Sequence, residues 1–287
     1  MTVSRIVPVL DYNYIARRVA QFLEEMLRKT DARGYVIGLS GGIDSTTVTY
    51  LVVKMLGRDK LKVLIMPDSN VTPEEDVEDA IYVAKVLGVE YYLFDVSKLI
   101  DSFSRILPFF DIDHNLSVGN LRARIRMASL YYFANRFNML VVGTGNKSEL
   151  LLGYFTKYGD GGADVLPLGD LYKVQVRDLA RFLGVPEKIV CKPSSPRLWK
   201  NQLTEDELGL KYELIDSILY LYVDKRMDAR NIASILGIHI DSVINIIRRI
   251  YRSEHKRRPP AIPRLTTTNI AYDLKLPMHI EDQEPEV

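Results

Sequence analysis

The chain has 287 residues, of which 47% are apolar and 26% are charged, the balance of an ordinary globular protein with room for a substantial core. Its formal net charge of +1 gives no reason to expect binding to nucleic acid or to an anionic membrane, so any polyanion must be bound at a local site. The single cysteine, Cys191, excludes an internal disulfide framework and a cysteine-based zinc cluster. No stretch approaches about 18 uninterrupted apolar residues and the first ten residues lack a signal-peptide pattern, so we expect a cytoplasmic protein with no membrane span.

The first part of the chain alternates helices with short apolar strands. An amphipathic helix is expected over 11–29. Strands are then predicted at 35–39, 61–66, 89–94 and 139–143, and the helices between them at 46–56, 73–87 and 117–136. This alternation predicts an α/β fold with a parallel, Rossmann-like sheet covered by helices on both faces. Ligands bind such sheets outside the carboxyl ends of the strands.

After residue 170 the pattern becomes helical. Helical runs are predicted at 171–183 and 209–223, separated by a loop at 192–206, and two short helices follow within 228–252. We expect one domain over 1–263, with its sheet core at about 34–190 and a helical C-terminal part at about 205–255. Residues 264–287 read as an extended or partly disordered tail.

The first strand is followed by the loop Ser40-Gly41-Gly42-Ile43-Asp44-Ser45, which leads into a helix. Glycines let the backbone approach a phosphate, and a helix N-terminus adds N–H donors. The lysine of a G-x-x-x-x-G-K-[ST] loop is missing, so the loop suits pyrophosphate rather than γ-phosphoryl transfer. Asp44 would repel an anion unless a cation lies between them, which makes it a candidate magnesium ligand. The alternative is a plain strand-to-helix turn capped by a serine.

Two further segments carry polar residues. Glu149 begins a helix after the fourth strand and could be a second carboxylate on the same metal, or a solvated residue at a helix start. The glycine-rich stretch 153–164 offers Lys157, Asp160 and Asp164, either as a loop that closes over a ligand or as a plain surface loop.

Basic residues occur in two more places. The run 252–260 would, on composition alone, be a solvated basic segment. Within 117–136, Arg122 and Arg126 lie four residues apart and share a helix face, whereas Arg124 must point elsewhere.

These segments resemble known motifs. S-G-G-I-D-S is similar to the S-G-G-x-D-S loop of the N-type ATP pyrophosphatases, which include GMP synthetases, asparagine synthetases, tRNA-modifying enzymes and NAD synthetases. F-T-K-Y-G-D-G-G-A-D at 155–164 and S-E-H-K-R-R-P-P at 253–260 are more specific and resemble the ammonia-dependent NAD synthetases, over about residues 15 to 263.

The resemblance implies a ligase that activates the nicotinate carboxylate of deamido-NAD as an acyl adenylate and lets ammonia displace AMP. ATP would be the co-substrate, Mg²⁺ the metal, and the enzyme a homodimer with 117–136 and 209–223 as plausible interface helices. The implied ATP-binding residues are Gly38, Leu39, Ser40, Gly41, Gly42, Ile43, Asp44, Ser45, Thr144, Lys173 and Ser195. Those implied for deamido-NAD are Arg124, Lys157, Asp164, His255 and Lys256; for the metal, Asp44 and Glu149; and for catalysis, Asp44, Lys173 and Asp164.

The chain departs from the family pattern in two places. Gly145-Asn146 replaces an aspartate–histidine pair found in many members, and Lys147 is expected to add a cation beside the metal. The loop after Lys192 reads Pro-Ser-Ser-Pro-Arg-Leu-Trp rather than P-[ST]-A-x-L, so Ser195 rests on a looser match than Lys173.

Rival functions remain at this point. A GMP synthetase-like or tRNA-modifying ligase would share the first loop, but the tRNA enzymes usually carry a basic surface or paired cysteines. A nucleotide-sensing module would not need two metal carboxylates. A glutamine-dependent NAD synthetase would need a separate amidase domain, for which 287 residues leave no room.

Overall fold

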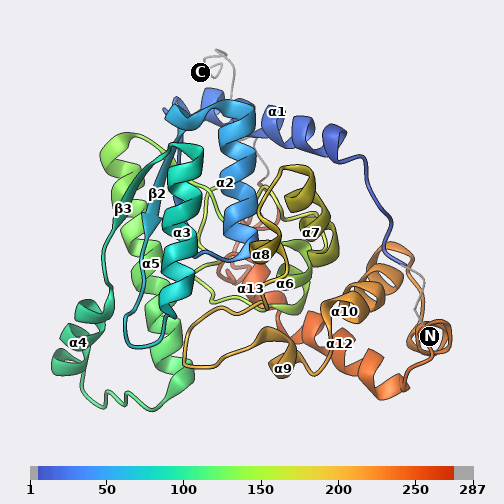
Figure 1. Cartoon of the computed structure of the whole chain (residues 1–287). Helices are drawn as coiled ribbons and strands as arrows, with labels where there is room; N and C mark the ends of the chain where they lie inside the picture. Colours follow the sequence, from blue (N-terminus) through green and yellow to red (C-terminus); the bar gives the residue numbers. More distant parts are fainter. Residues whose placement is uncertain (1–5, 275–287) are drawn as a thin grey trace.

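The structure is a computed structural model and describes residues 6–274 (Figure 1). Part of the predicted tail, 275–287, lies outside the described residues. No helix between residues 6 and 274 is both long and apolar enough to cross a bilayer.

Four parallel strands form the sheet: β1 (Tyr35–Gly38), β2 (Leu61–Ile65), β3 (Glu90–Leu93) and β4 (Leu140–Val141), in the order β3-β2-β1-β4. Tyr35 is opposite Leu61 on one side and Leu140 on the other. The chain moves outward from β1 to β3 and then returns to the far side of β1. Its direction therefore reverses between β1 and β4, and ligands of open α/β sheets bind at such a reversal.

Helices cover both faces of the sheet (Figure 1). One face packs against α1 (Tyr12–Thr30), α2 (Ile43–Leu56), α3 (Glu74–Leu87), α7 (Lys173–Phe182) and the short α8 (Glu187–Val190), around a large apolar core. The other face packs against α4 (Ser97–Ile106) and α5 (Asn115–Phe137), and a single 3₁₀ turn, η1 (Arg58–Lys60), precedes β2. The predicted Rossmann-like fold is confirmed.

The C-terminal helices form a core of their own, in which Tyr212 and Ile215 are fully buried. The elements are α6 (Lys147–Leu152), α9 (Thr204–Leu208), α10 (Tyr212–Leu219), a π-helical turn η2 (Tyr220–Asp224), α11 (Ala229–Leu236), α12 (Ile240–Arg252) and α13 (Glu254–Arg257). Contacts of α10 with α7, and of α12 with α6, fasten this part to the end of the sheet.

The predicted elements agree with the structure except at a few places. The fourth strand shortens to two residues, followed by a single bridge between Val142 and Val165. Helix α2 begins at Ile43 rather than at residue 46, because Gly42 is already its extended N-cap with φ −85° and ψ 163°. Asp44 therefore lies in the first helical turn. No element was predicted for α4 or α8, and α9 begins inside the segment 192–206 that was predicted as a loop.

Candidate active site

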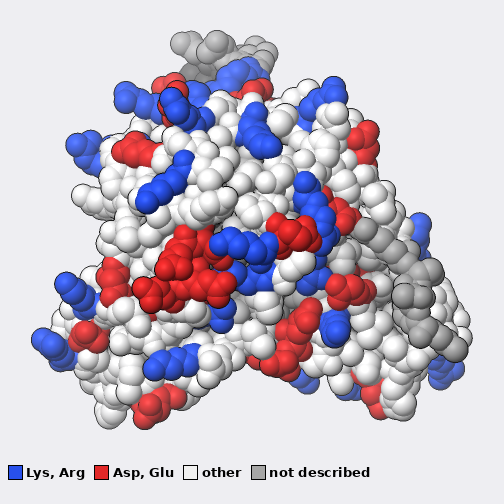
Figure 2. Space-filling model, viewed as in Figure 1, with Lys and Arg blue, Asp and Glu red and all other residues white. Residues whose placement is uncertain are grey.

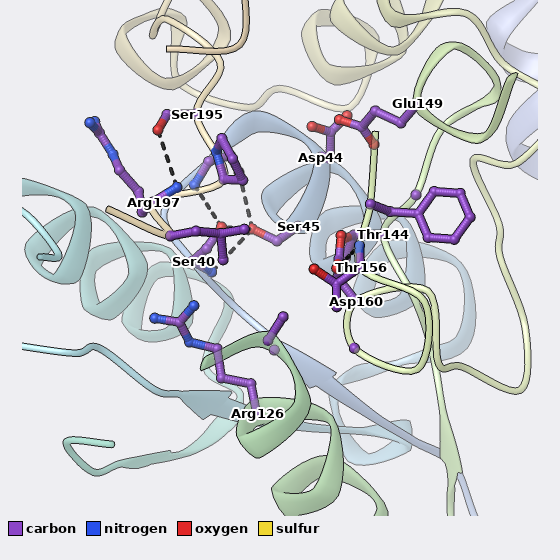
Figure 3. A pocket seen from close by; sticks show the side chains of 18 of the residues that line it. Ser40, Asp44, Ser45, Arg126, Thr144, Glu149, Thr156, Asp160, Ser195 and Arg197 are labelled. Atoms are coloured by element: carbon purple, nitrogen blue, oxygen red, sulfur yellow. Dashed lines mark hydrogen bonds between the residues drawn. The ribbon is translucent and has the colours of Figure 1, made fainter. Parts of the chain in front are cut away.

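A cleft of about 510 Å³ opens at the carboxyl ends of β1, β2 and β4, at the reversal of the sheet. Its walls come from the first turns of α2 and α6, the inner side of α5, and the loop that follows Lys192 (Figure 3). The predicted ATP-binding residues that line it are Gly38, Leu39, Ser40, Gly42, Ile43, Asp44, Ser45, Thr144, Lys173 and Ser195.

The first loop is held tightly behind the cleft wall. Gly41 has φ +75°, and a Cβ there would lie 2.1 Å from the carbonyl oxygen of Asp76 in α3, so only glycine fits. The hydroxyl oxygens of Ser40 and Ser45 lie 3.0 Å apart, and the N–H of Gly42 donates to Ser40 Oγ at 3.3 Å (Figure 3). The backbone thus takes the fixed turn that a phosphate-binding loop requires.

Asp44, Glu149 and Lys173 converge beside this loop. Lys173 is only 1% exposed; its Nζ contacts Asp44 Oδ2 and lies 3.8 Å from Glu149 Oε1. Burial opposes the charge on Lys173, but Asp44 and Glu149 outweigh it and raise the pKa of the ammonium. The two carboxylates, 105 residues apart in sequence, therefore face one cation position (Figure 3).

Burial, and then the charge of Asp44, raises the pKa of Glu149 to about 8. Among residues 6–274 no group of three or more His, Cys, Asp or Glu side chains could hold a metal ion. Two carboxylates beside a phosphate-binding loop are nevertheless the donor set that Mg²⁺ uses, since it keeps several waters and substrate phosphate oxygens as ligands. The residues present fit this ion.

The residues predicted for deamido-NAD gather around the loop 153–164, mostly outside the cleft. Lys256 lines the cleft and donates to the carbonyls of Gly153 and Phe155 at 2.7 Å each. Lys157 Nζ donates to the carbonyl of His255 at 2.7 Å, and Arg124 reaches the carbonyl of Lys157 at 3.4 Å. These contacts tie the loop to α13 on one side and to α5 on the other.

Asp164 lies apart from that group. Its carboxylate accepts from the N–H of Val141 at 2.7 Å and from the hydroxyl of Tyr131 at 3.1 Å. Arg124, Lys157, Asp164 and His255 do not line the cleft of about 510 Å³. His255 and Lys256 do line a second, neighbouring hollow of about 610 Å³ together with arginines of α12.

The arginines of α5 divide as predicted. Arg122 is buried and donates to Asp68 Oδ2 at 2.5 Å and to the carbonyl of Leu198 at 2.7 Å. Arg126 lines the cleft and donates to the carbonyl of Met66 at 3.0 Å, whereas Arg124 is exposed. Arg126 was not predicted to line the cleft, although its four-residue spacing from Arg122 was a usable signal.

The loop after Lys192 is fastened to α3. Lys192 Nζ lies 2.9 Å from Asp76 Oδ1 and also contacts Asp79, and Arg197 donates to Asp76 Oδ2 at 2.8 Å. These pairs position Ser195, whose hydroxyl accepts from the N–H of Arg197 at 3.2 Å at the edge of the cleft (Figure 3). No motif pointed to Asp76 and Asp79, which are 116 and 113 residues from Lys192.

The expectation for Lys147 is wrong. Its ammonium turns away from Asp44 and Glu149 and pairs with Asp224 at 3.1 Å and Asp170 at 3.4 Å. The cation beside the two carboxylates is Lys173.

The comparison with known proteins decides the family. The NAD synthase family model matches residues 15–260. The chain belongs to the NAD synthase family. An NH(3)-dependent NAD(+) synthetase from Hyperthermus butylicus is 52% identical over 254 residues, which is 88% of this chain and 91% of that protein. Other curated relatives, 42–47% identical, carry the same name.

Similar solved structures agree with this assignment. An NMN synthetase from Francisella tularensis has a TM-score of 0.76 at 32% identity, covering 89% of this chain and 100% of that one. An NH3-dependent NAD synthetase from Campylobacter jejuni has a TM-score of 0.74 at 29% identity, covering 88% and 100%. The GMP synthetase-like and tRNA-modifying alternatives are not favoured by these matches.

Proposed function

We propose that this member of the NAD synthase family is an ammonia-dependent NAD synthetase. A carboxylate oxygen of deamido-NAD attacks the α-phosphorus of ATP and pyrophosphate leaves. The nitrogen of ammonia then attacks the acyl carbon, AMP leaves with the C–O electron pair, and the nitrogen loses a proton to give the amide of NAD. The relatives' names and the form of the cleft support this reaction.

The observation that carries the proposal is the convergence of Asp44, Glu149 and Lys173 on one point beside the loop Ser40–Ser45. Such a site is built to hold a polyphosphate with its counter-cation. No cysteine or histidine lines the cleft in the described part of the chain, which agrees with a reaction that needs no protein nucleophile. Catalysis is then positioning and electrostatic stabilisation.

We assign roles to the residues on this basis. The loop 38–45 with Thr144, Lys173 and Ser195 binds ATP, and Asp44 and Glu149 hold Mg²⁺. When bound, Mg²⁺ neutralises charge on the phosphates. Lys173 places a second positive charge beside them. Asp44, Lys173 and Asp164 are the proposed catalytic residues.

We assign deamido-NAD to Arg124, Lys157, Asp164, His255 and Lys256. Four of these lie outside the ATP cleft, on the surface around loop 153–164 and α13. This supports a site that extends from the cleft over the surface, as expected for a substrate held at the boundary of a homodimer.

An exposed apolar surface on α4 and the segment after it supports a homodimer. It comprises Leu99, Phe103, Ile106, Leu107, Phe109, Ile112 and Leu116. Exposed apolar residues clustered in one segment are typical of protein interfaces. On the face in Figure 2 charges of both signs are mixed, which gives no support to a nucleic-acid surface. We further propose a cytoplasmic enzyme with one catalytic domain over 1–263.

One assay tests the proposed function. Purified protein is given deamido-NAD, ATP, Mg²⁺ and ammonium, and NAD, AMP and pyrophosphate are measured. We expect the three products in equal amounts, and no turnover with glutamine in place of ammonium. Because one structural relative is an NMN synthetase, nicotinate mononucleotide is tested in parallel. A preference for that substrate, or equal rates with glutamine, would contradict the proposal.

A further inference from the structure

Asn146 lies between the two proposed metal ligands and is fully buried. It is the N-cap of α6, and its side-chain Oδ1 accepts from the N–H of Glu149 at 3.0 Å. Its Nδ2 donates to Asp44 Oδ1 at 3.0 Å, and its own backbone N–H donates to Glu149 Oε2 at 3.2 Å. One residue therefore contacts both carboxylates.

The hydrogen bonds determine the orientation of the amide. The atom that faces the N–H of Glu149 must be an acceptor, so it is the carbonyl oxygen. The NH₂ group then faces Asp44, whose carboxylate accepts. An aspartate at this position would keep the cap but would place an oxygen against Asp44, and a serine would keep the cap but is too short to serve Asp44 as well.

The contacts also divide the carboxylate oxygens between two partners. Asn146 holds Oδ1 of Asp44 and Oε2 of Glu149, and the opposite oxygens, Oδ2 and Oε1, both face Lys173 Nζ. The side away from Asn146 is thus the side on which a cation lies. A cap alone would not need the NH₂ group to reach across to α2.

We propose that Asn146 is a positioning residue that turns Oδ2 of Asp44 and Oε1 of Glu149 toward one point and so preforms the metal site. This inference rests on the proposed assignment of Mg²⁺ to Asp44 and Glu149. Partners that orient metal ligands typically change metal affinity by about 10- to 100-fold when removed.

Metal binding without nucleotide tests the inference directly. Wild type, Asn146→Ser and Asn146→Ala are titrated with Mn²⁺, and free Mn²⁺ is followed by electron paramagnetic resonance. Serine is a strong N-cap, so Asn146→Ser retains the start of α6 and loses only the donor to Asp44. We expect the Mn²⁺ affinity of Asn146→Ser to fall about 10-fold or more, with a melting temperature close to that of wild type. Asn146→Ala, which lacks the cap as well, should show a lower Mn²⁺ affinity and a lower melting temperature.

Asp11→Ala is the matched control. Asp11 caps α1 by accepting from the N–H of Tyr14, three residues on, as Asn146 does for Glu149, and it does not line the cleft. The Asp11→Ala substitution should lower the melting temperature and leave the Mn²⁺ affinity unchanged. Pyrophosphate release gives a second readout. In Asn146→Ser the Mg²⁺ concentration for half-maximal release should rise by a larger factor than the factor by which kcat falls.

Two results would overturn the inference: Asn146→Ser binding Mn²⁺ as tightly as wild type, or wild type binding none without nucleotide. Failure of the proposed function is a separate result, because it is the absence of NAD from wild type in the ammonium assay. The Mn²⁺ affinities decide the role of Asn146 in either case.

Discussion

Replacing Lys173 with methionine removes the buried cation between Asp44 and Glu149 while keeping a side chain of similar length. Breaking a buried ion pair from one side costs about 3–5 kcal/mol, because the partner charge is left uncompensated. Asp44 makes the closer contact with Lys173 Nζ, and burial raises the pKa of Glu149, so Asp44 carries most of the loss. Asp44 keeps the Asn146 donor and its side chain is 18% exposed, which reduces the expected loss to roughly 2–4 kcal/mol.

A loss of this size should lower the melting temperature of Lys173→Met by roughly 5–10 °C in a chelator. Mg²⁺ should then stabilise the variant more than wild type, because no ammonium competes with it for Oδ2 of Asp44 and Oε1 of Glu149. A ligand present at about 100 times its Kd contributes about 2.7 kcal/mol, enough to offset most of the loss. NAD formation should nevertheless fall about 10²- to 10³-fold, because a charge aimed at the phosphates is gone.

Thermal unfolding with and without Mg²⁺ is the assay, and Lys147→Met is its control. Lys147 begins the neighbouring helix α6 and also pairs with two carboxylates, Asp224 and Asp170, but away from the cleft. Its replacement should cost less and show no added response to Mg²⁺. If Lys173→Met melted like wild type in chelator, or responded to Mg²⁺ no more than Lys147→Met, the reasoning about the shared cation position would be refuted.

Three further substitutions test residues that hold the elements around the cleft in place. Gly41→Ala forces a Cβ against the Asp76 carbonyl at φ +75°, so the KM for ATP should rise at least about 10-fold; an unchanged KM would contradict the tight turn. Arg122→Met leaves Asp68, which is 0% exposed, without its cation, and urea unfolding should show a loss of about 3–5 kcal/mol rather than a surface-like value below 1 kcal/mol. Burial raises the pKa of Asp216 from 3.8 to about 7, so its stabilising contribution is complete below about pH 4 and is lost as the pH rises through 7, on the order of 4 kcal/mol in all. Asp216→Asn should therefore flatten the fall in unfolding free energy between about pH 4 and pH 7, and an unchanged slope would assign that fall to other groups.

The parts of the fold that were predictable depend on local pattern. The first three residues of β1 are buried and apolar, so this run of side chains marks the strand in the sequence. The loop Ser40–Ser45 follows from residue types and its place between a strand and a helix. By contrast, α4 was missed although Leu99, Phe103 and Ile106 recur at helical spacing, because no element was assigned between the third strand and residue 117.

The site was predictable only in part, because its contacts are long-range. Nothing in local spacing places Lys173 on Asp44, 129 residues earlier, and only the family resemblance pointed to it. The misplacement of Lys147 has the same origin, since adjacency in sequence was taken for adjacency in space. Asn146 did carry a local signal, because Asn146 followed three residues later by Glu149 is the pattern of a capping box.

The start of α7 shows why these groups belong together. Lys173 is the first residue of that helix, and a cation at a helix N-terminus is opposed by the helix dipole. Asp44 and Glu149 lie in the first turns of α2 and α6, where the dipoles favour anions. Three helices therefore present their positive ends to one cleft, and the carboxylates make it possible to bury Lys173 there. Such an arrangement destabilises an empty site and favours a bound polyphosphate, so the stability lost at this point is what we expect ATP binding to recover.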